Sequence, residues 1–163
     1  MKVLGLDPGY GTLGYGVIEG PIDKCKLLAY GAIITPKTER FPERLRFIGQ
    51  KIIELYRDFG PDEIALEELF FQKNAKTAIM VAEARGVILY ECESFGIPLF
   101  EYTPLQIKQS LTGYGRADKK QIQEMVKLLL KMDKIPKPDD AADALAVAIT
   151  HLQTNKIFGN FKI

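Results

Sequence analysis

The chain has 163 residues with a net charge of +1, and 47% of its residues are hydrophobic. This length predicts one domain, and this hydrophobic content excludes an intrinsically disordered chain. No apolar stretch approaches the roughly 20 residues of a membrane span, and residues 3–6 are too few for a signal-peptide core. We therefore expect a cytoplasmic protein in which Cys25 and Cys92 are reduced and structural.

The chain opens with a short strand that ends in a carboxylate. Residues 3–6 are all apolar or glycine, Asp7 follows them, and Pro8 and Gly9 then break the pattern. Such a run predicts a central strand that is buried on both faces. Because α/β sheets place their sites at the carboxyl ends of strands, Asp7 is the first candidate site residue.

The next segment is rich in glycine. Gly9, Gly11 and Gly14 match the spacing of a dinucleotide-binding loop, but that loop must open a helix, and residues 15–18 have a strand sequence. We reject the dinucleotide interpretation and expect the glycines to let a turn pass close to the site or to a phosphate backbone. Strands at about 14–19 and 24–34 should complete an antiparallel meander.

A helix and a second carboxylate-tipped strand come next. Residues 42–59 have helical apolar spacing, and Gly60 and Pro61 end the helix. Residues 63–67 then repeat the opening pattern and finish at Glu67. A right-handed crossover would make this strand parallel to the first and adjacent to it. The pattern therefore places Glu67 beside Asp7.

The middle of the chain alternates helices with one more strand. We expect a helix with many small residues at 75–95, a strand at 99–102, and a short helix that Thr103 and Pro104 begin. A basic helix at about 119–132 should be capped by Asp118. Residues 105–137 contain eight Lys or Arg against three acids. On composition alone, a solvated helix face is the simpler interpretation of these charges.

The last helix, residues 139–151, carries acids in an alanine-rich sequence. Asp139 is the expected N-cap, and Asp140 and Asp143 share one face near the helix start. Asp143 lies among alanines in a helix that is apolar nearly all round, and a buried carboxylate needs a partner. No Lys or Arg is close to it in sequence. A metal ion is the simplest partner, and a cation from a distant part of the chain stays an alternative.

Asp7, Glu67, Asp140 and Asp143 thus form a candidate set. Two carboxylates about 4 Å apart repel each other by roughly 4 kcal/mol at an effective dielectric of 20, so a gathered set calls for a cation. Oxygen ligands favour Mg²⁺ or Mn²⁺, and two such ions can drive phosphodiester hydrolysis. From the residues alone, a set of purely structural acids is an equally good interpretation.

Several motifs resemble the RuvC family of Holliday-junction resolvases, in order and with similar spacing. They are LGLDPG at 4–9, ALEELF at 65–70, KNA at 73–75, EARG at 83–86, QIKQ at 106–109 after Tyr102, KKQIQEMV at 119–126, and DAADALA at 140–146 with Thr150 and His151. The resemblance implies an RNase H-like α/β fold, with a five-stranded mixed sheet of three antiparallel and then two parallel strands between helices. It assigns residues 1–155 to the resolvase domain, and the tail at 156–163 has no assigned function.

The resemblance also implies an activity, cofactors and partners. The protein would nick four-way junction DNA symmetrically, as a homodimer through the 75–95 helix, in recombination and repair beside the RuvA–RuvB motor. Two Mg²⁺ ions per subunit, or Mn²⁺, would bind Asp7, Glu67, Asp140 and Asp143, although some relatives have His at the Asp140 position and Asp139 could share that role. Phe70 would stack on unpaired bases, and His151 would be structural. The expected phosphate contacts are Lys108, Lys119, Lys120, Arg116 and Lys73.

Three other classes compete with this interpretation. An actin-like or sugar-kinase ATPase shares the fold and a similar opening loop but needs two such domains. A YqgF-type nuclease is usually shorter and lacks the loop that carries Phe70. A DNA-binding module without activity would have no need for Asp143 among alanines.

Overall fold

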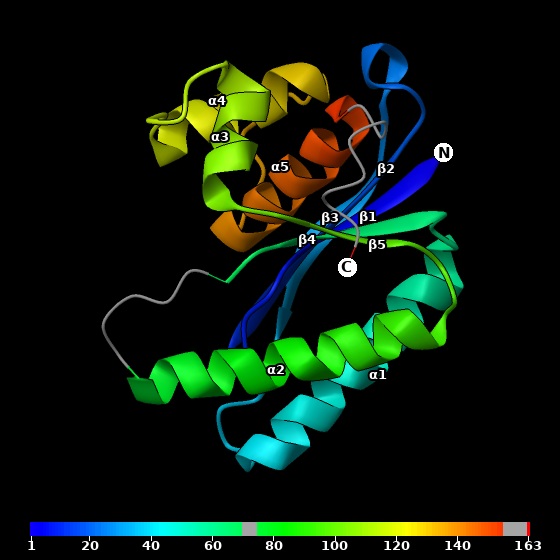
Figure 1. Cartoon of the computed structure of the whole chain (residues 1–163), viewed down its shortest axis with the longest axis vertical. Coiled ribbons are helices and arrows are strands. Elements are labelled where there is room, and N and C mark those ends of the chain that lie inside the picture. The colour runs from blue at the N-terminus through cyan, green and yellow to red at the C-terminus, as the bar shows by residue number, and fades with distance from the viewer. Residues whose placement is uncertain (70–74, 155–162) are drawn as a thin grey trace.

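The computed structural model describes residues 1–69, 75–154 and 163, and its helices pack on both faces of one sheet (Figure 1). The strands are β1 (Lys2–Asp7), β2 (Thr12–Glu19), β3 (Lys26–Ile34), β4 (Glu63–Glu67) and β5 (Leu99–Tyr102). The helices are α1 (Phe41–Phe59), α2 (Ala75–Ser94), α3 (Pro104–Thr112), α4 (Lys119–Leu129) and α5 (Asp139–Gln153), with a 3₁₀ turn η1 (Ile22–Lys24).

The sheet has the expected topology. Its strand order is β3-β2-β1-β4-β5, with β1, β2 and β3 antiparallel and with β1, β4 and β5 parallel. Leu6 pairs with Leu66, so β1 and β4 end at the same edge of the sheet. The prediction of a mixed five-stranded sheet, with β4 beside β1, is confirmed.

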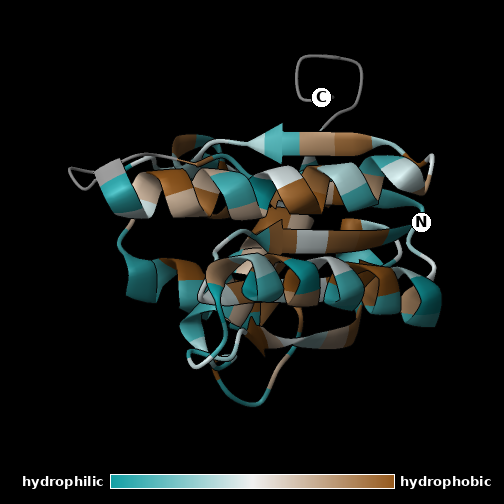
Figure 2. Ribbon diagram, turned by 90° about the horizontal axis from the view of Figure 1, so that it is seen from below, coloured by the Kyte–Doolittle hydropathy of each residue, from teal (hydrophilic) through white to brown (hydrophobic). Residues whose placement is uncertain are grey.

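Each face of the sheet has its own core. Val3 and Ile18 pack with Leu145 and Ile149 of α5, whereas Leu4 and Leu6 pack with residues of α1 and α2. Figure 1 shows α1 and α2 on one side of the sheet and α3, α4 and α5 on the other. The bodies of the strands are hydrophobic where the helix layers enclose them (Figure 2). This sandwiching explains why β1 is apolar on both faces.

Helix α5 lies unusually close to the sheet. A Cβ atom built at Gly5 would lie 2.2 Å from the carbonyl oxygen of Ala144, and one at Gly14 would lie 2.0 Å from that of Asp140. The sequence predicted that Gly14 would let a turn pass the site. Gly14 lies in β2, in agreement with the strand expected at about 14–19, but its missing side chain admits the backbone of α5 instead of a turn.

Some expected boundaries also differ. The third strand begins at Lys26 instead of residue 24, because residues 22–24 form η1, and α4 ends at Leu129. Asp118 and Thr103 cap their helices as expected. Asp139 does not cap α5, since Pro138 is the N-cap and Asp139 is the first helical residue. Cys25 and Cys92 are free thiols. Among the described residues, no helix is both long and apolar enough to cross a membrane.

His151 has the structural position that the sequence predicted. Its side chain is 1% exposed, its Nε2 lies 2.5 Å from a carboxylate oxygen of Glu63, and its Nδ1 lies 2.7 Å from the Tyr102 hydroxyl. These contacts join the end of α5 to the start of β4 and to the end of β5. Glu63 is at the opposite end of β4 from Glu67, whereas Tyr102 pairs with Glu67 across β4 and β5, so the network runs from the far end of β4 to the strand position beside Glu67.

We predict that His151→Leu lowers the free energy of unfolding by about 2–4 kcal/mol, because two buried polar groups lose a hydrogen-bond partner. Urea denaturation of the metal-free protein measures this difference. Ser110→Ala is the control, since it removes one hydrogen bond, from the Ser110 hydroxyl to Gln153, at an exposed position of α3. A loss no larger than that of the control would show that the network does not stabilise the fold.

Candidate active site

Two strands and one helix bring the four predicted carboxylates to one edge of the sheet. Asp7 and Glu67 finish the neighbouring parallel strands β1 and β4. Gly14 pairs with Asp7, and the backbone of Asp140 lies directly against Gly14. Asp143 follows one turn later on α5. All four side chains belong to half-buried residues at the rim of the core.

The carboxylates act on one another electrostatically. Burial, followed by the charges of Glu67, Asp143 and Asp140, raises the pKa of Asp7 to about 8, although Lys119 opposes the shift. Burial and the charge of Asp143 raise the pKa of Glu67 to about 7, against a hydrogen bond with Asp7 and the nearby lysines. Both carboxyl groups are therefore hard to ionise near neutral pH unless an added cation compensates their negative charge.

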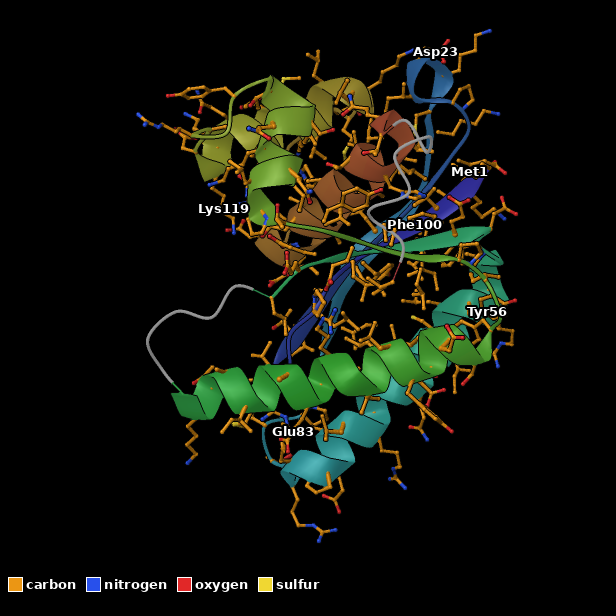
Figure 3. The ribbon with its side chains drawn as sticks, viewed as in Figure 1. Met1, Asp23, Tyr56, Glu83, Phe100 and Lys119 are labelled. Carbon is orange, nitrogen blue, oxygen red and sulfur yellow. The ribbon has the colours of Figure 1, made fainter. Side chains whose placement is uncertain are left out.

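A lysine from α4 also reaches the cluster. Lys119 Nζ lies 3.1 Å from Asp143 Oδ2, and Figure 3 labels this side chain. The sequence left open a partner from a distant part of the chain, and Lys119 is that partner. Burial nevertheless keeps the pKa of Asp143 above its usual value, with Lys119 opposing the shift. One lysine contacts Asp143, so most of the negative charge of the cluster is left uncompensated.

The carboxylate of Asp139 is in a different environment from that of Asp7. Its carboxylate lies 2.9 Å from Lys137 Nζ, 3.1 Å from Gln123 Nε2 and 3.5 Å from Lys119 Nζ. Lys137 and Lys119 lower the pKa of Asp139. Asp140, and not Asp139, is among the charges that act on Asp7, whereas both Asp139 and Asp140 act on Asp143. Asp139 is thus a neutralised carboxylate that helps to hold Lys119.

A hollow of about 230 Å³ opens beside the cluster. It is lined by Glu67, Pro104, Ile107, Lys108, Ala117, Asp118, Lys119, Ile122, Asp143 and Ala146. Residues 1–69, 75–154 and 163 contain no group of three His, Cys, Asp or Glu side chains already arranged to hold an ion. The donor set still fits a divalent cation, because it offers only carboxylate oxygens and its mutual repulsion favours added positive charge. Small side-chain rotations would have to bring the oxygens together.

The predicted DNA contacts fall into three groups. Lys108 and Lys119 line the hollow beside the carboxylates. Arg116 and Lys120 are exposed on the surface next to it. Phe70 and Lys73 lie outside the described residues. The predictions missed Gln123 and Lys137, which contact Asp139. No signal in the sequence marked them, because a polar residue on a basic helix and a lysine in a linker are both common surface features.

Known proteins resemble this chain in sequence over nearly its whole length. A family model described as "Crossover junction endodeoxyribonuclease RuvC" matches residues 3–151. Relatives with that same name include one from Alkaliphilus oremlandii, 52% identical over 100% of this chain and 99% of its own length. Another, from Finegoldia magna, is 53% identical over 96% of this chain and 95% of its own.

Solved structures of RuvC proteins also resemble this chain. Thermus thermophilus RuvC is 35% identical with a TM-score of 0.90, and the alignment covers 100% of both chains. The same protein in complex with a Holliday junction substrate gives 32% identity and a TM-score of 0.89, covering 100% of this chain and 99% of that one. The yeast mitochondrial resolvase Ydc2, at 16% identity and a TM-score of 0.69, shares the fold. From the match over residues 3–151 and the two relatives of similar length, it follows that this chain belongs to the RuvC family of crossover junction endodeoxyribonucleases.

Proposed function

We propose that the protein resolves Holliday junctions by paired symmetric nicks in DNA, in recombination and repair in the cytoplasm. The observation that carries this proposal is the cluster of Asp7, Glu67, Asp140 and Asp143, whose negative charge Lys119 compensates only in part. The membership of the chain in the RuvC family supports the choice of a DNA junction as substrate.

The four carboxylates would hold two Mg²⁺ ions per subunit, and Mn²⁺ could replace them. Bound divalent ions supply an activated water and charge stabilisation for the attacking and leaving oxygens of a phosphodiester. Asp7 and Glu67 are on two adjacent strands of a buried sheet, which fixes their separation. Asp140 and Asp143 are held by the close packing of α5 on Gly5 and Gly14. The fold would therefore hold the backbone of all four ligands near one another, and side-chain rotations would bring their oxygens onto the ions.

The lysines beside the cluster would hold the DNA backbone. Lys108 and Lys119 line the same hollow as Glu67 and Asp143, so a phosphate at the carboxylates lies within their reach. Arg116 and Lys120 extend the positive surface along the loop before α4 and its first turn. These contacts provide affinity and strong salt dependence without reading the base sequence.

A homodimer would place two such sites on one junction. Helix α2 packs against α1 and leaves Ile79 at 60% and Tyr90 at 72% exposure. Large apolar side chains exposed on one helix support a protein interface there. A dimer through α2 fits the pairing of two nicks on opposite strands. Action beside the RuvA–RuvB motor is a further part of the proposal and has only the family to support it.

A cleavage assay tests the proposal. Synthetic four-way junctions should be cut in paired positions when the protein and Mg²⁺ are added, while linear duplex DNA of the same sequence stays whole. Adding EDTA should stop the cutting, and restoring Mg²⁺ or Mn²⁺ should restart it. Tight binding of the junction without any cutting in either metal would contradict an endonuclease and leave a DNA-binding module.

A further inference from the structure

A second hollow lies next to the carboxylate site. It has a volume of about 500 Å³, and it is lined by Leu111, Thr112, Tyr114, Ala117, Asp118, Lys120, Gln121, Glu124 and Met125. Ala117 and Asp118 line both this hollow and the one that contains Glu67 and Asp143. The two hollows are therefore neighbours on either side of residues 117–118. We call the second one the α3–α4 groove.

The groove presents an exposed aromatic side chain on a well-ordered loop. Tyr114 is 55% exposed, yet its backbone N–H donates to the Thr112 hydroxyl at 3.2 Å and its carbonyl accepts from the Ala117 N–H at 3.2 Å. Gly113 begins this loop with a φ of 68° and donates its N–H to the carbonyl of Gln109 at 2.8 Å. The loop thus holds a large ring at the surface by local hydrogen bonds, without burying it in the core.

The chemistry of the groove suits a nucleotide. Leu111, Ala117 and Met125 give it an apolar lining, and Lys120 forms no salt bridge within the described residues. Two carboxylates, Asp118 and Glu124, also line the groove, and that of Asp118 is engaged in capping α4. An aromatic ring beside a cation is the combination with which proteins bind single-stranded nucleic acid, the ring for the base and the cation for the phosphate. A purely apolar protein partner would not need the lysine, and a phosphate alone would not need the ring.

The geometry points to the α3–α4 groove as a binding site for one unpaired nucleobase of the DNA strand whose phosphodiester lies at the carboxylates. This inference rests on the proposed function and adds a specificity-determining residue to it. Tyr114 stacks on the base, and Lys120 contacts a neighbouring phosphate. A nucleotide that leaves the stack next to the cut is thereby captured, which favours cutting at junctions, where bases unstack easily, over intact duplex.

Fluorescence of 2-aminopurine placed beside the cut position tests this inference. The junction is bound to Asp7→Asn protein so that it stays whole, and the signal is compared with and without Tyr114→Ala. Wild-type Tyr114 should change the fluorescence on binding, and Tyr114→Ala should abolish the change and weaken junction binding roughly 5- to 100-fold. Tyr114→Phe keeps the ring, so its affinity for the junction should stay within about twofold of that of the protein with Tyr114.

Two further variants separate stacking from charge. The logarithm of the binding constant falls linearly with the logarithm of the salt concentration. Lys120→Ala should make the slope of this line shallower by about one unit, whereas Tyr114→Ala should leave the slope unchanged. Tyr30→Ala removes a half-exposed tyrosine from β3, at the far edge of the sheet, and should change nothing in these assays.

The outcomes distinguish this inference from the proposed function. Failure of the unaltered protein to cut any junction would overturn both. Normal cutting together with equal affinities and equal fluorescence changes for Tyr114 and Tyr114→Ala would overturn the groove alone. A Tyr114→Phe variant that behaves like Tyr114→Ala would also overturn it, because a stacked ring does not need the hydroxyl group.

Discussion

Asp7→Asn is expected to lower the rate of junction cleavage about 10³-fold or more, with junction binding left intact. The change keeps the size of the side chain but removes the charge of a proposed metal ligand. Metal ions contribute several kcal/mol of charge stabilisation to phosphodiester hydrolysis, and each 1.36 kcal/mol corresponds to a tenfold change in rate. Single-turnover cleavage of a labelled four-way junction measures the rate, and gel-shift titration measures the affinity. Loss of binding together with cutting, in a variant that is fully folded, would contradict a metal-binding role.

The same substitution should make the metal-free protein more stable. Asp7 has a folded-state pKa of about 8 against an ordinary value of 3.8, so the unfolded chain ionises more easily than the folded one. Stability without metal is therefore lost as the pH rises from 3.8 towards about 8. In EDTA at pH 8, the melting temperature of Asp7→Asn should exceed that of the wild type. Added Mg²⁺ should raise the melting temperature of the wild type more than that of the variant.

Asp139→Asn is the matched control, because the two acids lie in opposite electrostatic environments. Lys137 and Lys119 lower the pKa of Asp139, so its charge stabilises the fold at neutral pH. Its amide variant should melt no higher than the wild type in EDTA, and it should still respond fully to Mg²⁺. If both variants melted higher and both lost the response to Mg²⁺, Asp139 would be a ligand of equal standing with Asp7.

The candidate site was predictable from the sequence because its parts are local patterns. A short apolar run that ends in a carboxylate places Asp7 and Glu67 at strand ends, and the crossover rule makes those strands neighbours. A spacing of three places Asp140 and Asp143 on one face of a helix. None of these inferences requires knowledge of how distant segments pack. For the same reason the meander of β1, β2 and β3 and the pairing of β4 with β1 were also predictable, whereas the position of β5 was not predicted.

Most of the contacts that the sequence could not reveal are between distant elements. Lys119 reaches Asp143 only because α4 packs against α5, and 24 positions separate the two residues. Asp139 was the expected cap of α5, but its carboxylate is bound by Lys137 and Gln123, and Pro138 takes the cap position. The role of Gly14 was also missed. A side chain at this position would collide with the carbonyl oxygen of Asp140, which is 126 positions later in the chain.

Gly14→Ala is the second substitution for which a large effect is expected, because it forces α5 away from the sheet. The new Cβ would lie 2.0 Å from the carbonyl oxygen of Asp140 and 2.5 Å from its carbonyl carbon, and both are backbone atoms that no rotamer change can move. Overpacking of this kind typically costs about 1–3 kcal/mol and occasionally more. Here we expect at least about 3 kcal/mol, measured by urea denaturation in EDTA.

The displacement should also separate Asp140 and Asp143 from Asp7 and Glu67, because both proposed ligands are in the first two turns of α5 and the backbone of Asp140 lies on Gly14. Titration with Mn²⁺ should therefore show weaker metal binding in whatever fraction of Gly14→Ala is folded. Gly11→Ala, in the turn before β2, is the control, since its new Cβ would meet only the end of the Arg44 side chain, at 3.6 Å. Equal stability and equal Mn²⁺ affinity in the two variants would show that the position of α5 does not depend on Gly14. The metal site would then have to obtain its rigidity from the strands alone.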